Sequence, residues 1–327
     1  MIALAFRPTG YRPDMPYQSK WQGLPTEAIN EASLAIDKMS ALDIVDLVVN
    51  EDRKVVAAVN RERERIAHGV DIIAGALKKK GRIFLVGAGT SGRLGVVEAA
   101  EMPPTFSTPP ELVQAIMAGG QEAVFRAREG VEDNFEEGTR AVARLRVNKR
   151  DVMIGVSASG ITQFVRGALT GARKVGARII FVTCWPGADL QNYVDLIIAP
   201  AVGPEIIAGS TRLKAGTATK MVLNMLTTIA MVRIGKTYGN LMVDVKTGSD
   251  KLKDRAKRIV MIVTGLDDTQ ALDLLLRAKW NVKIAIVMQK AGLSYTKAIA
   301  RLKKSDDSIR EAIGEDIEPR LRALIGS

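Results

Sequence analysis

Apolar residues follow two different patterns along the chain. Between Pro25 and about Lys79 they recur every three or four residues, as at Ile29, Ala32, Ile36 and Met39, which predicts helices, the last of them long. From about residue 80 to residue 202, short and mainly apolar runs alternate with segments of helical length. These runs are "RIFLVG" (82–87), "LVQAIMAG" (112–119), "DVMIGVSA" (151–158), "RIIFVTC" (178–184) and "DLIIAP" (195–200).

Strands that are apolar throughout are typical of a parallel sheet covered by helices on both faces. We therefore expect an α/β fold, a doubly wound parallel sheet in an αβα sandwich, with N-terminal helices before it. The segment 216–236 is apolar nearly all round, which predicts a buried central or interface helix. Three short helical patterns from about Gly265 predict a small C-terminal helical bundle. The predicted divisions are an irregular arm at 1–22, the sheet domain with its N-terminal helices at 23–246, and a helical region at 247–327.

Composition limits the location and the partners of the protein. The 327 residues are 47% hydrophobic and 25% charged, as in soluble globular proteins. No apolar run approaches the roughly 20 residues that a membrane-spanning helix needs, and the N-terminus lacks the apolar core of a signal peptide. A single cysteine, Cys184, cannot form an intrachain disulfide. We therefore expect a cytoplasmic protein that does not contact membranes.

The net charge of +11 raises the possibility of nucleic-acid binding. Much of the excess lies in helical patterns such as "KLKDRAKR" (251–258) and "RLKK" (301–304), with no zinc-finger or RRM signature beside them. We expect an anionic metabolite as ligand and no nucleic acid. The only histidine, His68, lies inside a charged helical pattern, so acid–base chemistry is expected from carboxylates, lysines or tyrosines.

The first apolar run ends in a loop, Gly87 to Gly92, that spells GxGxxG and opens into a helical pattern. A dinucleotide fold would place an acid at the end of the second strand to bind the ribose hydroxyls. Here the second run ends in "IMAGG", and the nearest acid, Glu111, lies at its beginning, which disfavours a dinucleotide. Thr90 and Ser91, beside backbone N–H groups at a helix N-terminus, suit a single phosphate.

Two further segments repeat this chemistry: "SASGIT" (157–162) follows the third apolar run, and "GSTRLKAGT" (209–217) precedes the apolar helix. Because the carboxyl ends of parallel strands meet at one edge of a sheet, we expect the three loops to surround one small phosphorylated ligand. Helix capping could explain any one loop, but three together, with two cations in the third, favour a phosphate site. The predicted binding residues are Gly89, Thr90, Ser91, Ser157, Ser159, Gly160, Thr162, Ser210, Thr211, Arg212 and Lys214; no metal site is predicted.

Two glutamates are candidates for catalysis. Glu101 lies at the end of a helical pattern, just before Pro103 and Pro104, where a negative charge opposes the helix dipole and stability alone would not select it. Glu132 lies in "REGVEDNFEEG", an acidic cluster whose simplest interpretation is a solvated helix start. Sequence spacing alone does not bring the two side chains together.

Several stretches are specific in combination. They are "LPTEAINEASLAID" (24–37), "VGAGTSGRLGVVEAAEMPPTF" (86–106), "AGGQEAVFRAREGVEDN" (118–134), "VGPEIIAGSTRLKAGTATKMVLNML" (202–226) and "GKTYGNLMVDV" (235–245). With them the chain resembles the N-acetylmuramic acid 6-phosphate etherases, a single-SIS-domain sugar-phosphate family related to the glucokinase regulatory proteins. The resemblance runs from about residue 24 to the C-terminal helices, and it implies that 23–246 is an SIS-type domain.

The resemblance implies a homodimer without a cofactor that cleaves the D-lactyl ether of N-acetylmuramic acid 6-phosphate, giving N-acetylglucosamine 6-phosphate and D-lactate. It implies β-elimination followed by addition of water. The Glu of the family's "ECPPT" motif, which protonates the departing lactate, corresponds to Glu101 in "EMPPT". The second catalytic Glu, in "EGAED", corresponds to Glu132 in "EGVED".

The second loop departs from the family pattern. The family usually reads "ASGRTPY", whereas this chain has Ile161, Gln163 and Phe164 in place of the Arg, Pro and Tyr. Because Ile161 has no charge, we expect the anionic lactyl group to be bound differently from the usual way in the family. Two other functions remain open on the same fold: a sugar-phosphate-binding regulator without catalysis, and an aldose–ketose isomerase, which would leave the C3 substituent in place.

Overall fold

The computed structural model describes residues 23–190 and 193–326, so the predicted arm at 1–22 lies outside the described residues. The chain forms two compact units. Of the described residues, the first unit comprises those up to Ala99 together with those of Val113–Leu226, and the second comprises Ala100–Leu112 with those from Thr227 onward. The predicted division between 246 and 247 stays a prediction.

The first unit is built on a parallel sheet of five strands, ordered β2-β1-β3-β4-β5. Each apolar run of the sequence contains one strand, as predicted. Ile83 at the start of β1 pairs with Val113 of β2 on one side and Val152 of β3 on the other. The strands are β1 (Ile83–Gly87), β2 (Val113–Met117), β3 (Val152–Val156), β4 (Arg178–Val182) and β5 (Leu196–Ile198).

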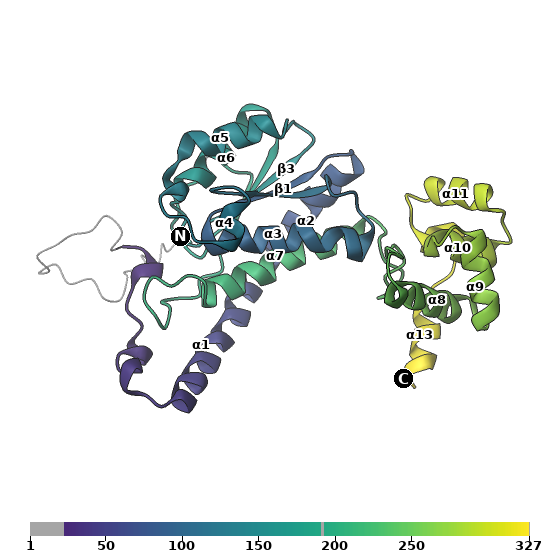
Figure 1. The fold of residues 1–327 in the computed structure, drawn as a ribbon, viewed down its shortest axis with the longest axis horizontal. Coiled ribbons are helices and arrows are strands. Elements are labelled where there is room, and N and C mark those ends of the chain that lie inside the picture. Colours follow the sequence, from purple (N-terminus) through teal and green to yellow (C-terminus); the bar gives the residue numbers. More distant parts are fainter. Residues whose placement is uncertain (1–22, 191–192, 327) are drawn as a thin grey trace, which may run out of the picture. The chain divides into compact units, whose positions relative to one another are not determined.

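Helices cover both faces of this sheet, which confirms the doubly wound αβα sandwich (Figure 1). On one face lie α5 (Phe135–Arg144) and α6 (Gln163–Lys174). On the other lie α2 (Arg63–Lys78), α3 (Gly89–Phe106) and α7 (Lys214–Arg233). The apolar segment 216–236 of the sequence lies mostly in α7. Within the described ranges, no helix is long and apolar enough to cross a bilayer.

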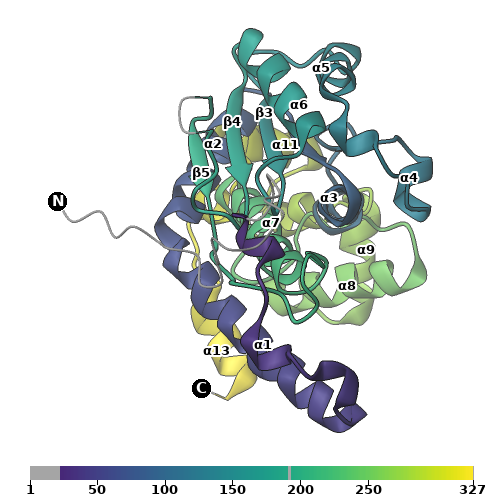
Figure 2. The same ribbon diagram turned by 90° about the vertical axis from the view of Figure 1, so that its left-hand side faces the viewer.

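Helix α1 (Ala41–Arg61) precedes these layers and is visible from two directions (Figures 1 and 2). It begins at Ser40, whose hydroxyl accepts the N–H of Asp43. The predicted long helix is in fact two, because α1 ends at Arg61 and α2 begins at Arg63. Glu62 between them accepts the N–H of Ala199 through its carboxylate, which ties the break to the loop after β5.

The stretch before α1 differs from the prediction. It forms three short 3-10 helices instead of an α-helix: η1 (Pro25–Glu27), η2 (Glu31–Ser33) and η3 (Ile36–Lys38). The apolar side chains Ile29 and Leu34 are about 70% exposed, at 69% and 71%, so the first unit gives them no buried face to pack against. The Asn30 side chain accepts the N–H of Ala32, which favours a local turn over a continuous helix.

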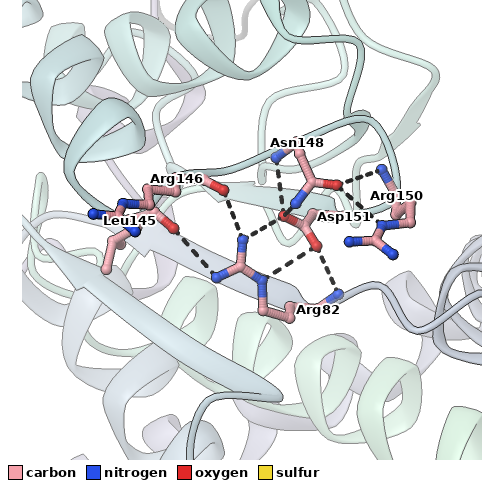
Figure 3. Close-up of polar contacts among 6 residues, drawn as sticks. All are labelled: Arg82, Leu145, Arg146, Asn148, Arg150 and Asp151. Carbon is pink, nitrogen blue, oxygen red and sulfur yellow. Dashed lines mark hydrogen bonds and ion pairs between the residues drawn. The ribbon is translucent and has the colours of Figure 1, made fainter.

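A partly buried ion pair between Arg82 and Asp151 connects the amino ends of β1 and β3 (Figure 3). Asp151, 1% exposed, accepts the backbone N–H of Arg82 at 2.9 Å and its Nη2 at 2.7 Å. The same guanidinium donates to the carbonyls of Leu145 at 3.2 Å and Arg146 at 2.8 Å. Asn148 also donates to Asp151. These contacts stabilise the sheet at its amino edge and leave the carboxyl edge to the glycine- and hydroxyl-rich loops.

The second unit confirms the predicted helical C-terminus. After α8 (Asp250–Thr264), which Gly265 caps, five helices follow in the described chain, where the sequence pattern predicted three. The last two helices have only five and eight residues, so each contains too few turns for a helical spacing of apolar residues to be recognised in the sequence. The five are α9 (Asp268–Arg277), α10 (Val282–Ala291), α11 (Tyr295–Lys304), α12 (Ile309–Ile313) and α13 (Glu318–Ile325).

Candidate active site

A pocket of about 260 Å³ lies at the carboxyl ends of β1 and β3. These strands are the point at which the strand order of the sheet changes direction, where ligands bind in doubly wound folds. Its lining combines parts of all three predicted loops with the segment between β2 and α5. The lining residues with polar side chains are Thr90, Ser91, Arg93, Arg128, Glu129, Glu132, Ser159, Thr162 and Thr211.

The first loop lies at the N-terminal end of α3, and Gly89, Thr90 and Ser91 all line the pocket. Gly92 has to be a glycine, because a Cβ there would lie 2.2 Å from the sulfur of Met117 and 2.7 Å from the carbonyl oxygen of Gly87. This close approach turns the chain directly from β1 into α3. The positive end of the α3 dipole therefore faces the pocket, which favours an anion there.

The second loop is shaped by its own hydroxyls. The Oγ of Ser157, a buried residue, lies 2.8 Å from Oγ1 of Thr162 and accepts the N–H of Gly160 at 3.1 Å. Gly160 has a φ of 78°, and a Cβ there would lie 2.8 Å from Ala188. Ser159 and Thr162 line the pocket, whereas Ser157 and Gly160 do not and instead fix the turn that presents them.

The third loop brings only Thr211 to the pocket; Ser210 and Arg212 are not among the lining residues. Lys214, predicted to bind phosphate, is 2% exposed, and its Nζ lies 2.5 Å from Oε2 of Glu51 on α1. The structure thus places the Lys214 ammonium in a buried ion pair.

Two buried carboxylates hold the segment that carries Thr211. Burial would raise the pKa of Glu51, but hydrogen bonds from Lys214, Lys54 and Asn30 outweigh it and lower the pKa to about 2. Burial raises the pKa of Glu205, although this carboxylate accepts the N–H groups of Lys214 and Ala215 at the start of α7. Those two amides are therefore occupied by protein and do not serve a phosphate.

The two predicted catalytic glutamates occupy different places. Glu132 lies in the 3-10 helix η4 (Val131–Asp133) and lines the pocket beside Glu129. Glu101 is exposed and does not line this pocket. It follows Thr90 by three turns of α3, about 16 Å along the helix axis. Glu132 therefore shares the pocket with the hydroxyl loops, whereas Glu101 belongs to the second unit.

Two arginines that line the pocket, Arg93 and Arg128, were not among the residues predicted from the sequence. Arg93 follows the first loop and donates from Nε and Nη2 to the carbonyls of Val124, at 2.9 Å, and Ala123, at 2.8 Å, at the end of the short helix α4 (Glu122–Phe125). Arg128 lies four positions before Glu132 on the same segment. The sequence does contain a signal for both: each arginine lies inside one of the family-like stretches that also carry a candidate catalytic glutamate, Arg93 in 86–106 and Arg128 in 118–134.

Among the described residues, no group of three or more His, Cys, Asp or Glu could hold a metal ion.

Several known proteins are similar to this chain. The model of the glucokinase regulatory protein N-terminal SIS domain matches residues 65–173, which include β1 to β3 and the first two loops. An N-acetylmuramic acid 6-phosphate etherase of Rhodopirellula baltica is 51% identical over 265 residues, 81% of this chain and 88% of that protein. The etherase of Salinibacter ruber is 48% identical over 309 residues, 93% of this chain and 99% of that protein. Among solved structures, a phosphoheptose isomerase from Neisseria gonorrhoeae is similar at a TM-score of 0.46 and 18% identity, covering 58% of this chain and 98% of that one.

Proposed function

The chain belongs to the N-acetylmuramic acid 6-phosphate etherase family, and we propose that it cleaves the D-lactyl ether of N-acetylmuramic acid 6-phosphate. The products are N-acetylglucosamine 6-phosphate and D-lactate, as in amino-sugar recycling. The observation that carries this proposal is the pocket itself. It joins the hydroxyls of Thr90, Ser91, Ser159 and Thr162 to the carboxylate of Glu132 at the switch point of the sheet.

In the proposed reaction, the hydroxyls and the N-terminus of α3 bind the C6 phosphate, which orients the far end of the sugar. Opening of the ring places an aldehyde at C1, so the proton on C2 becomes acidic. Glu132 removes this proton, the C3–O bond breaks, and Glu101 protonates the departing lactate oxygen. Water then adds to the resulting alkene, its oxygen to C3 and a proton to C2. This chemistry needs one carboxylate as base and one carboxylic acid as proton donor, and no cofactor.

We propose that the protein is a homodimer. Helix α1 carries a second apolar stripe, which is exposed and beside its buried face. Leu42, Val45, Val49 and Val56, spaced three, four and seven residues apart, are each between 46% and 70% exposed. A stripe at this spacing suits packing against a helix of another copy. A second copy also allows Glu101 of the partner subunit to complete the pocket that holds Glu132.

The shared site predicts that two inactive variants complement each other. Glu101→Gln and Glu132→Gln should each fail to release D-lactate alone, and an equal mixture of re-associated subunits should recover about a quarter of wild-type activity. Half of the dimers are then mixed, and each mixed dimer has one intact site out of two. The measurement is D-lactate release after unfolding and refolding the mixture. If dimers mix, as copies carrying different tags would show, and no activity returns, the two glutamates do not act across subunits.

We also propose a cytoplasmic location. The single cysteine, Cys184, is buried, and its Sγ lies 3.8 Å from the carbonyl oxygen of Ala215. Burial raises the pKa of this thiol to about 12, so it stays protonated and unreactive. A buried free thiol suits a reducing compartment.

The function is tested by incubating the protein with N-acetylmuramic acid 6-phosphate in ¹⁸O-water. We expect D-lactate and an N-acetylglucosamine 6-phosphate that carries the label at C3, because the C3–O bond of the ether is broken and water supplies the new oxygen. Mass spectrometry of both products measures this. Binding without turnover would instead support a regulator. A product that keeps the lactyl group but has become a ketose would support an isomerase.

A further inference from the structure

The substrate class of the proposed reaction carries two anions at opposite ends of the sugar, the C6 phosphate and the lactyl carboxylate on C3. The hydroxyls of the first two loops and the N-terminus of α3 serve the phosphate. The position at which the family pattern has an Arg in the second loop is occupied by the uncharged Ile161. A carboxylate removed from water needs a charged partner or several hydrogen bonds, so another cation has to be found in the pocket.

Two arginines line the pocket, and their guanidinium groups differ in what they can still bind. Arg93 already uses Nε and Nη2, one of the two-pronged edges of its guanidinium, for the carbonyls of Val124 and Ala123. Arg128 uses only Nη1, which lies 3.1 Å from Oε2 of Glu122 and 3.5 Å from the carbonyl oxygen of Gly119. Its Nε and Nη2 donate to no other described residue. Arg128 therefore keeps an edge of parallel N–H donors that matches a carboxylate.

The place of Arg128 on the chain fits the same ligand. It lies on the segment that leads to Glu132, and both side chains line the pocket. Glu132 acts on C2, and the lactyl ether is attached to the neighbouring carbon C3. The lactyl carboxylate consequently falls on the Glu132 side of the sugar, away from the phosphate. The side chain of Glu122 that holds Nη1 is mostly exposed, so this pair orients the guanidinium without neutralising it strongly.

We propose that Arg128 binds the lactyl carboxylate of the substrate through Nε and Nη2, and so selects sugar phosphates whose C3 ether carries a carboxylate. This inference rests on the proposed etherase function and adds to it the residue that recognises the leaving group. It also accounts for the loss of a cation at Ile161, because the charge is supplied from the segment before η4 instead of from the second loop.

The test compares two substrates: N-acetylmuramic acid 6-phosphate and its lactamide, in which the lactyl carboxylate is replaced by a neutral carboxamide. Both retain the phosphate and the ether. We expect Arg128→Met to lower kcat/KM for the carboxylate substrate roughly 10- to 100-fold and to change it about twofold or less for the lactamide. Arg128→Lys, which keeps a charge but not the fork, should recover part of the loss. The matched control is Arg126→Met, which removes an exposed arginine outside the lining of the pocket and should match wild type on both substrates.

The outcomes separate this inference from the function on which it rests. An equal loss on both substrates would mean that Arg128 serves the phosphate or the fold, and an unchanged kcat/KM on both would mean that it binds neither anion; each result overturns the inference while the etherase function stands. A wild-type protein that releases neither D-lactate nor D-lactamide would refute the etherase function itself, and the inference with it.

Discussion

Replacing Glu132 with Gln should abolish the exchange of the C2 proton of N-acetylmuramic acid 6-phosphate with solvent deuterium and lower D-lactate release by roughly 10³-fold. The reason is that Gln has nearly the shape of Glu but cannot accept the proton. Glu132 lines the pocket and is held by η4 after Gly130, whose φ of 77° sets the turn. The variant should therefore still bind the sugar phosphate. Mass analysis of recovered substrate measures the exchange, and a D-lactate assay measures turnover.

The control for this variant is Asp133→Asn, the neighbouring carboxylate of η4, which does not line the pocket and should retain exchange and turnover. Undiminished C2 exchange in Glu132→Gln would show that Glu132 is not the base. Glu129, the other carboxylate that lines the pocket, would then be the candidate.

The sequence predicts those features of the fold that depend on local pattern. Each buried strand is marked by its run of apolar residues, and the loops after β1 and β3 are marked by their Gly and Ser or Thr residues. Parallel strands share one carboxyl edge, so the sequence alone predicts that Thr90, Ser159 and Thr162 lie at the same pocket. The presence of Glu132 in the same pocket came from the family resemblance and not from spacing.

Other features depend on contacts between residues far apart in the chain, and these the pattern does not contain. Lys214 and Glu51 are separated by 163 positions, and nothing local distinguishes this buried lysine from a ligand-binding one. The exposure of Ile29 and Leu34 likewise depends on what the rest of the unit offers as a packing surface. The hydrogen bonds of the two arginines depend in the same way on the fold. Arg93 donates from Nε to the carbonyl of Val124, and Arg128 donates from Nη1 to the carbonyl of Gly119.

The buried pair of Lys214 and Glu51 predicts a large loss of stability in Lys214→Met. Both side chains are about 95% or more buried, at 3% and 5% exposure, and removing one partner of a buried pair leaves an uncompensated charge. We expect the free energy of unfolding of the first unit to fall by about 3 kcal/mol at pH 7. The shift in the pKa of Glu51, from 4.5 to about 2, gives the same order of magnitude, about 3 kcal/mol. Urea denaturation followed by tryptophan fluorescence measures the change.

The sign of the pH dependence follows from the direction of that shift. Because the pKa of Glu51 in the folded state lies below its ordinary 4.5, the stabilisation is fully present above about pH 4.5 and is lost as the pH falls toward 2. The difference in stability between wild type and Lys214→Met should therefore shrink over this interval. Lys54→Met is the matched control, since Lys54 also contacts Glu51 but its side chain is 62% exposed, and its removal should cost less than about 1 kcal/mol.

The same variant separates the two possible roles of Lys214. A lysine that binds substrate phosphate would, when replaced by Met, raise KM and leave the urea midpoint unchanged at every pH. A lysine that neutralises Glu51 would lower the midpoint at pH 7, and Glu51→Gln combined with Lys214→Met should recover part of the loss because the buried charge is removed with its partner. An unchanged midpoint with a raised KM would therefore return Lys214 to the phosphate site. The expected result instead makes it the anchor of the segment that presents Thr211 to the pocket.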